Sequence, residues 1–422
     1  MLGKILRTPR IRNETNDEDR GWKLLSGLFG SGNKTMSGEI VTPESAISNI
    51  GVVFACVVIR SNAMSKLPLQ VFRKTTNGRE RVTNHPVAYL LEKRPNKHQS
   101  PSQFKKFIET SLLLWGNAFV KQVFDRRGRI TELLPLQPSR VSINKQGNDY
   151  FYNYTNDQGN VEVFTEDEIW HIPYITTDGK IGKAPITVAR ENAGVLMAMQ
   201  RFESNFYKNG TITKGALKVD EALESGVKEV IKDEWRRMYG GGNNAGDIAI
   251  LDHGMEWLNI SLPLKDAEFV LSRKMTRNEI ATIFNVPAFM LNDLEKATFN
   301  NFEQMKLLYA ENTLMPSCIA IEEEINYKAF LDNERDLYVK FNMNGAMRGD
   351  GQSRVTYYKG LMEVGGITPN EIRRLEYFDH YTLPEADMPY MTRNLSPLDA
   401  IKDNATGGGG RSEEIQEHED TQ

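Results

Sequence analysis

The chain has 422 residues, of which 40% are hydrophobic and 26% are charged, and its formal net charge is −4 at pH 7. This is the composition of an ordinary globular protein with room for two or three domains. Six acidic and two basic residues lie in 401–422 and account for the whole net charge, so residues 1–400 are balanced. A protein that grips nucleic acid through its phosphates is expected to carry an excess of Lys and Arg, and this chain has none.

The sequence shows no sign of a membrane segment or of a redox or metal role for cysteine. The longest apolar run, Ile50–Ile59, is too short to span a bilayer, and the N-terminus lacks the apolar core of a signal peptide. We therefore expect no membrane contact and a cytoplasmic site of synthesis. Cys56 and Cys318 lie in apolar helical segments without metal-ligand spacing, which predicts two buried free thiols.

The N-terminal third is predicted to be mostly helical. Residues 1–42 are polar and rich in Gly, Asn and Arg, which predicts a flexible arm. Thr42 is expected to cap a helix with Pro43 at its first position, and the apolar pattern extends this single helix to about Ser65. A strand and two helices follow at Leu67–Arg73, His85–Asn96 and Pro101–Trp115.

Residues 117–172 alternate apolar and polar side chains, with turn-forming residues between the alternating segments. This pattern predicts one antiparallel meander with a polar face. Its strands are expected at Asn117–Phe124, Ile130–Leu136, Arg140–Asn144, Tyr150–Tyr154, Val161–Thr165 and Glu168–Ile172.

A small α/β unit, Thr211–Ser261, interrupts a pair of helices. Its pattern predicts a strand, a helix over Glu221–Tyr239, a glycine-rich turn and two more strands. The helix Ile186–Tyr207 precedes the unit and the helix Lys265–Phe284 follows it. The two helices are therefore expected to form a stalk that carries the inserted unit.

A longer helix is expected to start near Asn300, with Glu303 completing a capping box, and to kink at Pro316. The connection that leads to it is of mixed charge and has Lys296 near its tip. The remaining elements are the strand Asp336–Asn342, the helices Ser353–Val364 and Pro369–Phe378 with a Thr368 and Glu371 capping box, and a disordered acidic tail at 396–422.

Some segments match motifs for phosphate binding or nucleophilic catalysis in part, but none matches in full. The segment Gly179–Pro185 lacks the first glycine of a phosphate-binding loop, and Gly240–Gly246 follows a helix rather than a strand. Ser102 and Lys105 have S-x-x-K spacing, but the supporting motifs are missing, so Ser102 fits a helix start better. We therefore predict no enzyme activity, no catalytic residue and no cofactor.

The sequence also lacks a metal-binding pattern. The six histidines form no H-E-x-x-H or other close pair, which favours surface or hydrogen-bonded histidines over ligands. Glu322, Glu323 and Glu324 are consecutive on a helix and fan around it, so they predict a solvated or subunit-facing patch. No metal site is expected.

Six segments, in this order and spacing, resemble the HK97-type portal proteins of tailed bacteriophages. The resemblance spans about Pro43–Tyr381. The segments are "VFACVVIRSNAMSKLPLQVF" from Val53, "HPVAYLLEKRPN" from His85, "LLLWGNAF" from Leu112, "LLPLQPSRV" from Leu133, "EIATIFNVPAFMLNDLEKATFNNFEQ" from Glu279 and "GGITPNEIRRLE" from Gly365.

The resemblance implies an α+β portal-type subunit with an α/β wing, a two-helix stem, a small α/β clip, a long kinked helix and a helical crown. Between the arm (1–42) and the tail (396–422), the implied ranges are wing 43–199 and 301–345, stem 200–210 and 263–286, clip 211–262, tunnel loop 287–300 and crown 346–395.

The resemblance further implies a dodecameric ring at one capsid vertex, with a channel through which double-stranded DNA is packaged and ejected. Its implied partners are terminase, which carries the ATP-driven motor, the major capsid or scaffold protein, and a head-tail adaptor. The implied location is the virion, and the host cytoplasm during assembly. A separate motor agrees with the missing phosphate-binding loop.

Two groups of residues are expected to act in such a ring. Lys296, Thr298 and Asn300 of the tunnel loop are expected to face the channel near DNA, although Lys296 also fits a plain exposed loop lysine. Arg273, Lys274 and Arg277 gather on one side of the second stem helix. They either line the stem or pair with carboxylates of the next subunit.

Two other classes of protein remain open from the residues alone. A phage enzyme that processes nucleic acid needs a convergent catalytic site, and none is visible in the sequence. A sequence-specific DNA-binding protein needs a basic recognition helix, which the balanced charge disfavours.

Overall fold

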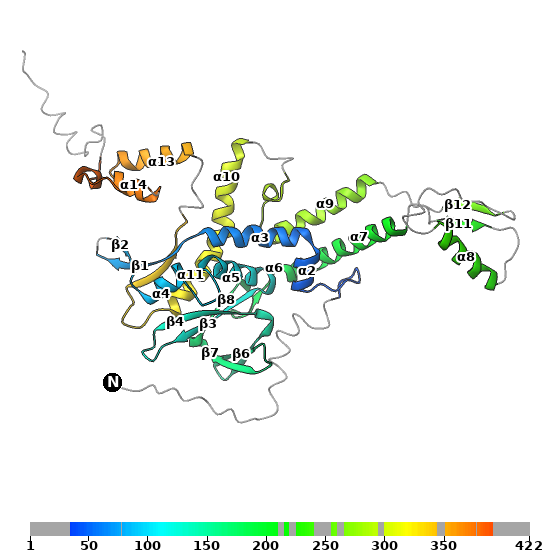
Figure 1. The fold of residues 1–422 in the computed structure, drawn as a ribbon, viewed down its shortest axis with the longest axis horizontal. Coiled ribbons are helices and arrows are strands. Elements are labelled where there is room, and N and C mark those ends of the chain that lie inside the picture. The colour runs from blue at the N-terminus through cyan, green and yellow to red at the C-terminus, as the bar shows by residue number, and fades with distance from the viewer. Residues whose placement is uncertain are drawn as a thin grey trace, which may run out of the picture. The chain divides into compact units, whose positions relative to one another are not determined.

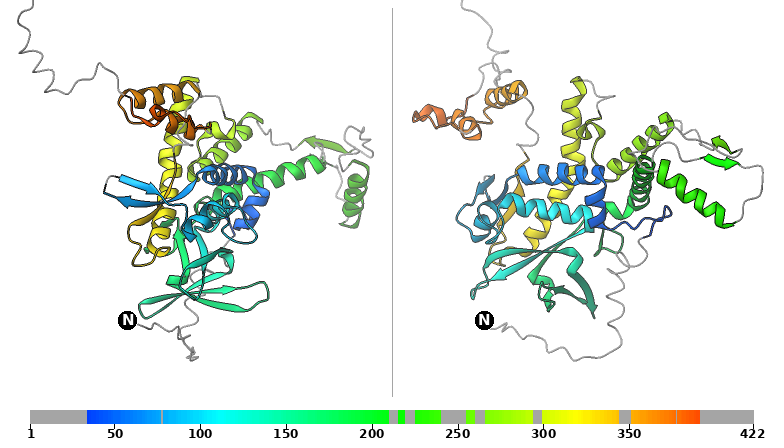
Figure 2. Two further views of the ribbon diagram at one scale, coloured as in Figure 1. Left: turned by 60° about the vertical axis from the view of Figure 1, so that its left-hand side comes forward. Right: turned by 45° about the vertical axis from the view of Figure 1, so that its right-hand side comes forward.

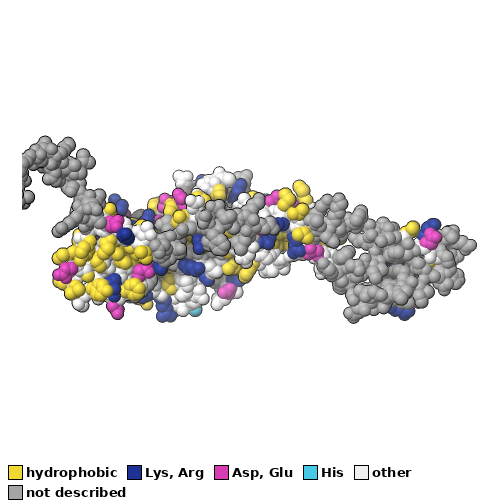
Figure 3. Space-filling model, turned by 90° about the horizontal axis from the view of Figure 1, so that it is seen from above, with side chains coloured by type: hydrophobic (Ala, Val, Ile, Leu, Met, Phe, Trp, Pro, Cys, Tyr) yellow, Lys and Arg dark blue, Asp and Glu magenta, His cyan; other side chains and the backbone are white. Residues whose placement is uncertain are grey.

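A computed structural model describes residues 34–76, 78–209, 215–218, 225–239, 255–259, 266–293, 299–343, 351–376 and 378–390. The chain divides into two compact units, residues 1–347 and 348–422. Helices and small antiparallel sheets are mixed along the first unit, which confirms the α+β class (Figure 1). Lys/Arg and Asp/Glu side chains are intermingled on the face drawn in Figure 3, as the balanced composition predicts.

The apolar helix predicted from Thr42 to Ser65 is two helices, α2 (Pro43–Asn49) and α3 (Gly51–Lys66), which meet at 100°. Thr42 caps α2 as expected, in a capping box with Ser45. The single-helix prediction is wrong because Ile50 has an extended backbone and both helices bury apolar side chains in one core. No single described helix is long and apolar enough to cross a membrane, and only α2 and α3 taken together meet the length and composition criteria.

The last part of the expected flexible arm, residues 34–41, is held against helix α7 (Arg190–Asn209). The buried Glu39 accepts from Arg201 at 2.6 Å, and the Met36 amide donates to Glu191 at 3.0 Å. A Cβ at Gly194 would lie 2.5 Å from Thr35 Oγ1, so only glycine allows this approach. Residues 1–33 lie outside the described part of the chain.

The first sheet has the strand order β13-β1-β2. Its strands are β1 (Leu69–Thr75), β2 (Gly78–Arg81) and β13 (Leu337–Phe341). Helices α4 (Pro86–Glu92) and α5 (Pro101–Trp115) share one apolar core with the inner face of this sheet. Cys318 lies in this core and Cys56 in the neighbouring one, both as buried free thiols, as predicted.

The predicted single meander is two three-stranded sheets, with orders β4-β3-β8 and β5-β6-β7. The bounds are β3 (Asn117–Phe124), β4 (Ile130–Leu136), β5 (Val141–Gln146), β6 (Asp149–Thr155), β7 (Val161–Thr165) and β8 (Ile169–Pro173). The meander prediction is wrong at two places, because β4 and β5 lie in different sheets and β8 returns to pair with β3 instead of β7.

A buried histidine joins these two sheets. His171 Nδ1 lies 3.1 Å from the Tyr152 hydroxyl, and its Nε2 lies 3.0 Å from Asn117 Oδ1. Asn117 Oδ1 also accepts from the Gly182 amide, so it acts as an acceptor, which fits a neutral ring that donates from Nε2 and accepts at Nδ1. Burial, with the nearby Lys180 and Lys328, lowers the pKa of His171 to about 3.

The buried His171 predicts that the folded protein loses stability at acidic pH. Below an ordinary histidine pKa of about 6.5, the unfolded chain binds a proton at His171 that the folded protein does not, so stability falls as pH falls. We expect a loss of about 2 kcal/mol of unfolding free energy between neutral pH and pH 5 from this residue. Denaturant unfolding at the two pH values checks this. A His171→Gln variant with the same pH slope as the wild type would contradict it.

The inserted unit and its two flanking helices follow. Helix α6 (Pro185–Val188) leads into α7, and α9 (Asp266–Ile283) returns beside α7 (Figure 1). Between them lie β11 (Gly215–Lys218), α8 (Ser225–Tyr239) and β12 (Glu256–Asn259), with β11 antiparallel to β12. The predicted strand at 247–251 and the glycine-rich turn at 240–246 lie outside the described residues.

The long helix is interrupted where Pro316 predicted a kink. It consists of α10 (Phe299–Tyr309), a π-helical turn (Ala310–Leu314) and α11 (Met315–Lys328). A proline cannot donate to the preceding turn, so the wider turn before Pro316 accommodates it. The helix begins one residue before Asn300, so the predicted cap at that residue is wrong.

Helix α11 supplies hydrogen-bond acceptors to an edge strand in each of two sheets. The prediction of a solvated or subunit-facing patch at Glu322–Glu324 is therefore wrong for Glu322 and Glu324. Glu322 accepts from the Phe341 amide of β13 at 2.6 Å, and Glu324 accepts from the His171 amide of β8 at 2.8 Å. Both strands lie at sheet edges, whose free amides need partners. Of the three glutamates, only Glu323 is exposed.

The second unit contains helices α13 (Gly351–Glu363) and α14 (Pro369–Leu375) and a 3-10 turn (Pro384–Asp387). The capping box predicted at Thr368 and Glu371 is confirmed. The tail predicted to be disordered, 396–422, lies outside the described residues.

Candidate functional site

The two stalk helices are joined by side chains of the same chain. Arg273 of α9 donates to both carboxylate oxygens of Glu203 on α7 at 2.8 Å. Nearer the base of the stalk, the Asn192 amide donates to Glu279 at 2.5 Å. Both partners of the Arg273 pair are partly exposed, so it sets the alignment of the helices more than their stability.

The other two predicted stalk cations hold the segment that follows α9. Arg277 donates to the Leu291 carbonyl at 2.7 Å, and Lys274 lies 3.8 Å from Asp293. These contacts fix the 3-10 turn Ala288–Leu291, which opens the expected tunnel loop. Each of the three cations thus has a partner within its own chain, and a role in lining a channel stays a prediction for all three.

The three predicted loop residues lie wholly or partly outside what the structure describes. Lys296 and Thr298 lie outside the described residues. Asn300 is the second residue of α10, and the direction of its side chain is likewise outside what the structure describes. Their approach to DNA stays a prediction.

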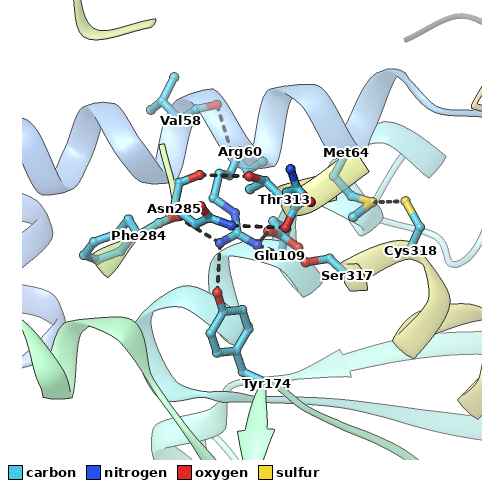
Figure 4. Close-up of polar contacts among 12 residues, drawn as sticks. Val58, Arg60, Met64, Glu109, Tyr174, Phe284, Asn285, Thr313, Ser317 and Cys318 are labelled. Atoms are coloured by element: carbon cyan, nitrogen blue, oxygen red, sulfur yellow. Dashed lines mark hydrogen bonds and ion pairs between the residues drawn. The ribbon is translucent and has the colours of Figure 1, made fainter. Parts of the chain in front are cut away.

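A buried ion pair lies where the base of the stalk and the long helix pack against α3 and α5 (Figure 4). Arg60 of α3 and Glu109 of α5 are 2.7 Å apart, with side chains 1% and 0% exposed. Arg60 also donates to the Phe284 carbonyl after α9 at 3.0 Å, to Ser317 on α11 at 2.9 Å and to the Tyr174 hydroxyl at 3.1 Å. One side chain thereby joins five segments of the chain. We call this cluster the Arg60 junction.

The electrostatics of the junction depend on the pair being intact. Burial alone lowers the pKa of Arg60, but Glu109 and Tyr174 raise it by more, so the guanidinium stays charged. Arg60 is the partner that the structure gives the buried Glu109 carboxylate, whose oxygens find no other hydrogen bond in the described part of the chain. Burial also raises the pKa of Tyr309, at the end of α10.

A second link ties the end of α9 to the π-helical turn. Asn285 has a left-handed backbone with φ 53°, and its side-chain amide donates to the Asn312 carbonyl at 3.1 Å. Thr313 donates back to the Asn285 carbonyl at 3.0 Å. A π-turn leaves backbone carbonyls without their usual helical partner, and Asn285 satisfies one of them. These two hydrogen bonds therefore attach the π-helical turn to the base of the stalk.

The described residues offer no catalytic arrangement. Within them, no three His, Cys, Asp or Glu side chains are grouped so as to hold a metal ion. A cleft of about 200 Å³ contains His85 and Glu334, but His85 caps α4 through Nδ1 and bonds Glu334 through Nε2 at 3.3 Å. His85 and His171 are thus hydrogen-bonded histidines, as the sequence indicated.

The base of a two-helix stalk, which carries an inserted α/β unit at its other end (Figure 1), meets a long interrupted helix at the Arg60 junction, so the described part of the fold is organised around a structural contact. The family model for the phage portal protein matches residues 51–376. The chain therefore belongs to the phage portal protein family, whose members are structural proteins rather than enzymes.

Individual relatives agree with this assignment. The portal protein of Enterobacteria phage HK97 is 29% identical over 91% of this chain and 92% of its own length. The probable portal protein of Streptomyces phage phiC31 is 27% identical over 87% of this chain and 82% of its own. A solved chain from the neck of an empty gene transfer agent particle, computed with C6 symmetry, shares the fold with a TM-score of 0.56. It is 22% identical and covers 80% of this chain and 93% of its own. The resemblance to HK97-type portals is confirmed.

Proposed function

We propose that the chain forms a closed ring, dodecameric in the capsid, at one capsid vertex. The observation that carries the proposal is apolar surface along the stalk that one subunit leaves open. Five large side chains of α7 and α9 are 38–64% exposed: Val195, Phe202, Val270, Leu271 and Met275. Apolar patches of this kind mark interfaces, and a heterologous contact that closes produces a ring. A fold relative solved as a neck with C12 symmetry supports the same arrangement.

In this ring the stalk would be the stem, the inserted unit the clip, and residues 287–300 the tunnel loop around a DNA channel. Residues 43–199 and 301–345 would be the wing, and residues 346–395 the crown. Duplex DNA must slide through such a channel, and a charge-balanced body suits sliding better than a basic groove does. Arg273, Lys274 and Arg277 would lie at the stem, and Lys296, Thr298 and Asn300 at the loop.

The partners would be terminase, the major capsid or scaffold protein, and a head-tail adaptor. The chain would have no catalytic activity of its own, and terminase would supply ATP hydrolysis. Assembly would take place in the host cytoplasm and the product would be part of the virion. Metal-dependent cleavage of DNA by the purified chain would favour a nucleic-acid enzyme, and a sequence preference would favour a DNA-binding protein.

A charge reversal at Lys296 tests whether the tunnel loop contributes to DNA packaging. Lys296→Glu is expected to leave ring assembly intact and to lower the amount of packaged DNA at least about tenfold, because each subunit of the ring repeats the repulsion of phosphates. The measurement is nuclease-protected DNA per assembled particle. Lys97→Glu, on an exposed lysine of the wing, is the matched control and should package normally. Equal packaging by Lys296→Glu and wild type would remove the loop from the mechanism.

A further inference from the structure

The sheet β13-β1-β2 has one buried face and one cationic face. The buried face carries apolar side chains such as Leu69, Val71 and Val339. The strand register places the alternate residues of the three strands side by side on the opposite face. These residues are Phe72, Lys74, Arg79, Arg81, Tyr338 and Lys340, and we call this surface the cationic sheet face.

Aromatic rings hold the cations of this face in place. Phe72 and Tyr338 stack with ring centroids 5.8 Å apart and an interplanar angle of 29°. The Arg79 guanidinium lies 4.9 Å from the Phe72 ring centre, and the Lys74 ammonium lies 5.9 Å from the Tyr338 ring centre. The rings are therefore occupied by each other and by the cations, and the face presents charge rather than an open stacking surface.

Two of the four cations have no carboxylate partner. Arg81 pairs with Glu92 at 2.8 Å, and Lys340 lies 3.9 Å from Glu322. In the described part of the chain, no carboxylate oxygen lies within ion-pair distance of Lys74 or Arg79, and both side chains are exposed. All four residues of β2 are exposed as well. Figure 2 shows the β1–β2 hairpin standing out from the body of the first unit.

We propose that the cationic sheet face binds the phosphate backbone of duplex DNA outside the channel. Charge complementarity carries the choice of ligand, because exposed Lys and Arg heads without carboxylates suit phosphate oxygens. Single strands are disfavoured because their binding relies on open aromatic faces, and these rings are covered. The site is independent of base sequence. This proposal rests on the proposed function, because a ring would repeat a weak site around the vertex and so raise the total affinity for DNA.

Binding of labelled duplex to purified full-length protein tests the proposal, by fluorescence anisotropy at low and at near-physiological salt. We expect weak binding at low salt that falls steeply as salt rises. The double variant Lys74→Glu/Arg79→Glu should weaken low-salt binding at least about tenfold and make the slope of log K against log salt shallower by about 2. Lys74→Ala/Arg79→Ala should show the same direction with a smaller loss.

The control is Lys97→Glu/Lys145→Glu, which changes the net charge by the same amount at two exposed lysines that lie outside the sheet β13-β1-β2. It should change binding less than about twofold, because neither lysine lies on the cationic sheet face. Equal weakening by both charge reversals, or no weakening by the sheet variant, would overturn the proposal. Preference for polyglutamate over duplex would overturn it in favour of an acidic protein partner. Light scattering on the same samples reports ring formation separately, so a failure of the ring and a failure of the DNA site are distinguishable.

Discussion

Replacing Glu109 with alanine is expected to destabilise the first unit by about 3–5 kcal/mol, because it leaves the Arg60 guanidinium buried and unpaired. Arg60 also donates hydrogen bonds to the Phe284 carbonyl and to Ser317, so its disturbance reaches both the base of the stalk and the long helix. Denaturant unfolding followed by circular dichroism measures the loss. Ring formation by the variant, measured by light scattering, should fall with it.

An exposed ion pair provides the control for this variant. Arg335 and Asp332 form such a pair with side chains 82% and 101% exposed, so Asp332→Ala should change stability by less than about 1 kcal/mol. The double replacement Arg60→Met/Glu109→Leu removes both charges and should recover much of the stability that Glu109→Ala loses. A cost of Glu109→Ala no larger than that of Asp332→Ala would show that the buried pair does not hold the junction.

Gly182→Ala is expected to prevent folding or to cost at least about 3 kcal/mol, because the new methyl group meets backbone on two sides. A Cβ at Gly182 would lie 1.9 Å from the Gly116 carbonyl oxygen and 2.7 Å from the Tyr174 amide nitrogen. Backbone atoms of a packed sheet region cannot move aside as a flexible side chain can. Soluble yield and unfolding free energy are the measurements.

The matched substitution Gly360→Ala should have the opposite sign. Gly360 lies inside α13, and a Cβ added there would have open space within 4 Å, so alanine should stabilise that helix by about 0.5–1 kcal/mol. A wild-type stability for Gly182→Ala would mean that the close approach of Gly182 to Gly116 is not part of the folded protein.

Local signals in the sequence predicted local structure well. The strands Asn117–Phe124, Ile130–Leu136 and Val161–Thr165 have the predicted bounds, because alternation and turn residues define them without help from distant parts. The caps at Thr42 and Thr368 are where short-range hydrogen bonding placed them. Strand partners could not be predicted in the same way, and the return of β8 to β3 depends on contacts far apart in the sequence.

The Arg60 junction was missed, although one signal for it was present. Arg60 lies in the otherwise apolar stripe of Val53, Val57 and Met64, and a cation in such a stripe must either leave the core or find a buried partner. Its partner Glu109 lies on another helix, and no spacing links the two. The contacts of Glu322 and Glu324 could not be predicted either, because their partners are amides of strands that only the tertiary fold brings near.

Native mass spectrometry of the purified full-length chain, with negative-stain images of the same sample, tests the central claim most directly. We predict closed rings of about a dozen copies with a central hole, because the exposed apolar surface of the stalk needs a neighbour on each side. A mass of one or two chains, unchanged when capsid and scaffold proteins are co-expressed, would contradict the ring and the channel built on it.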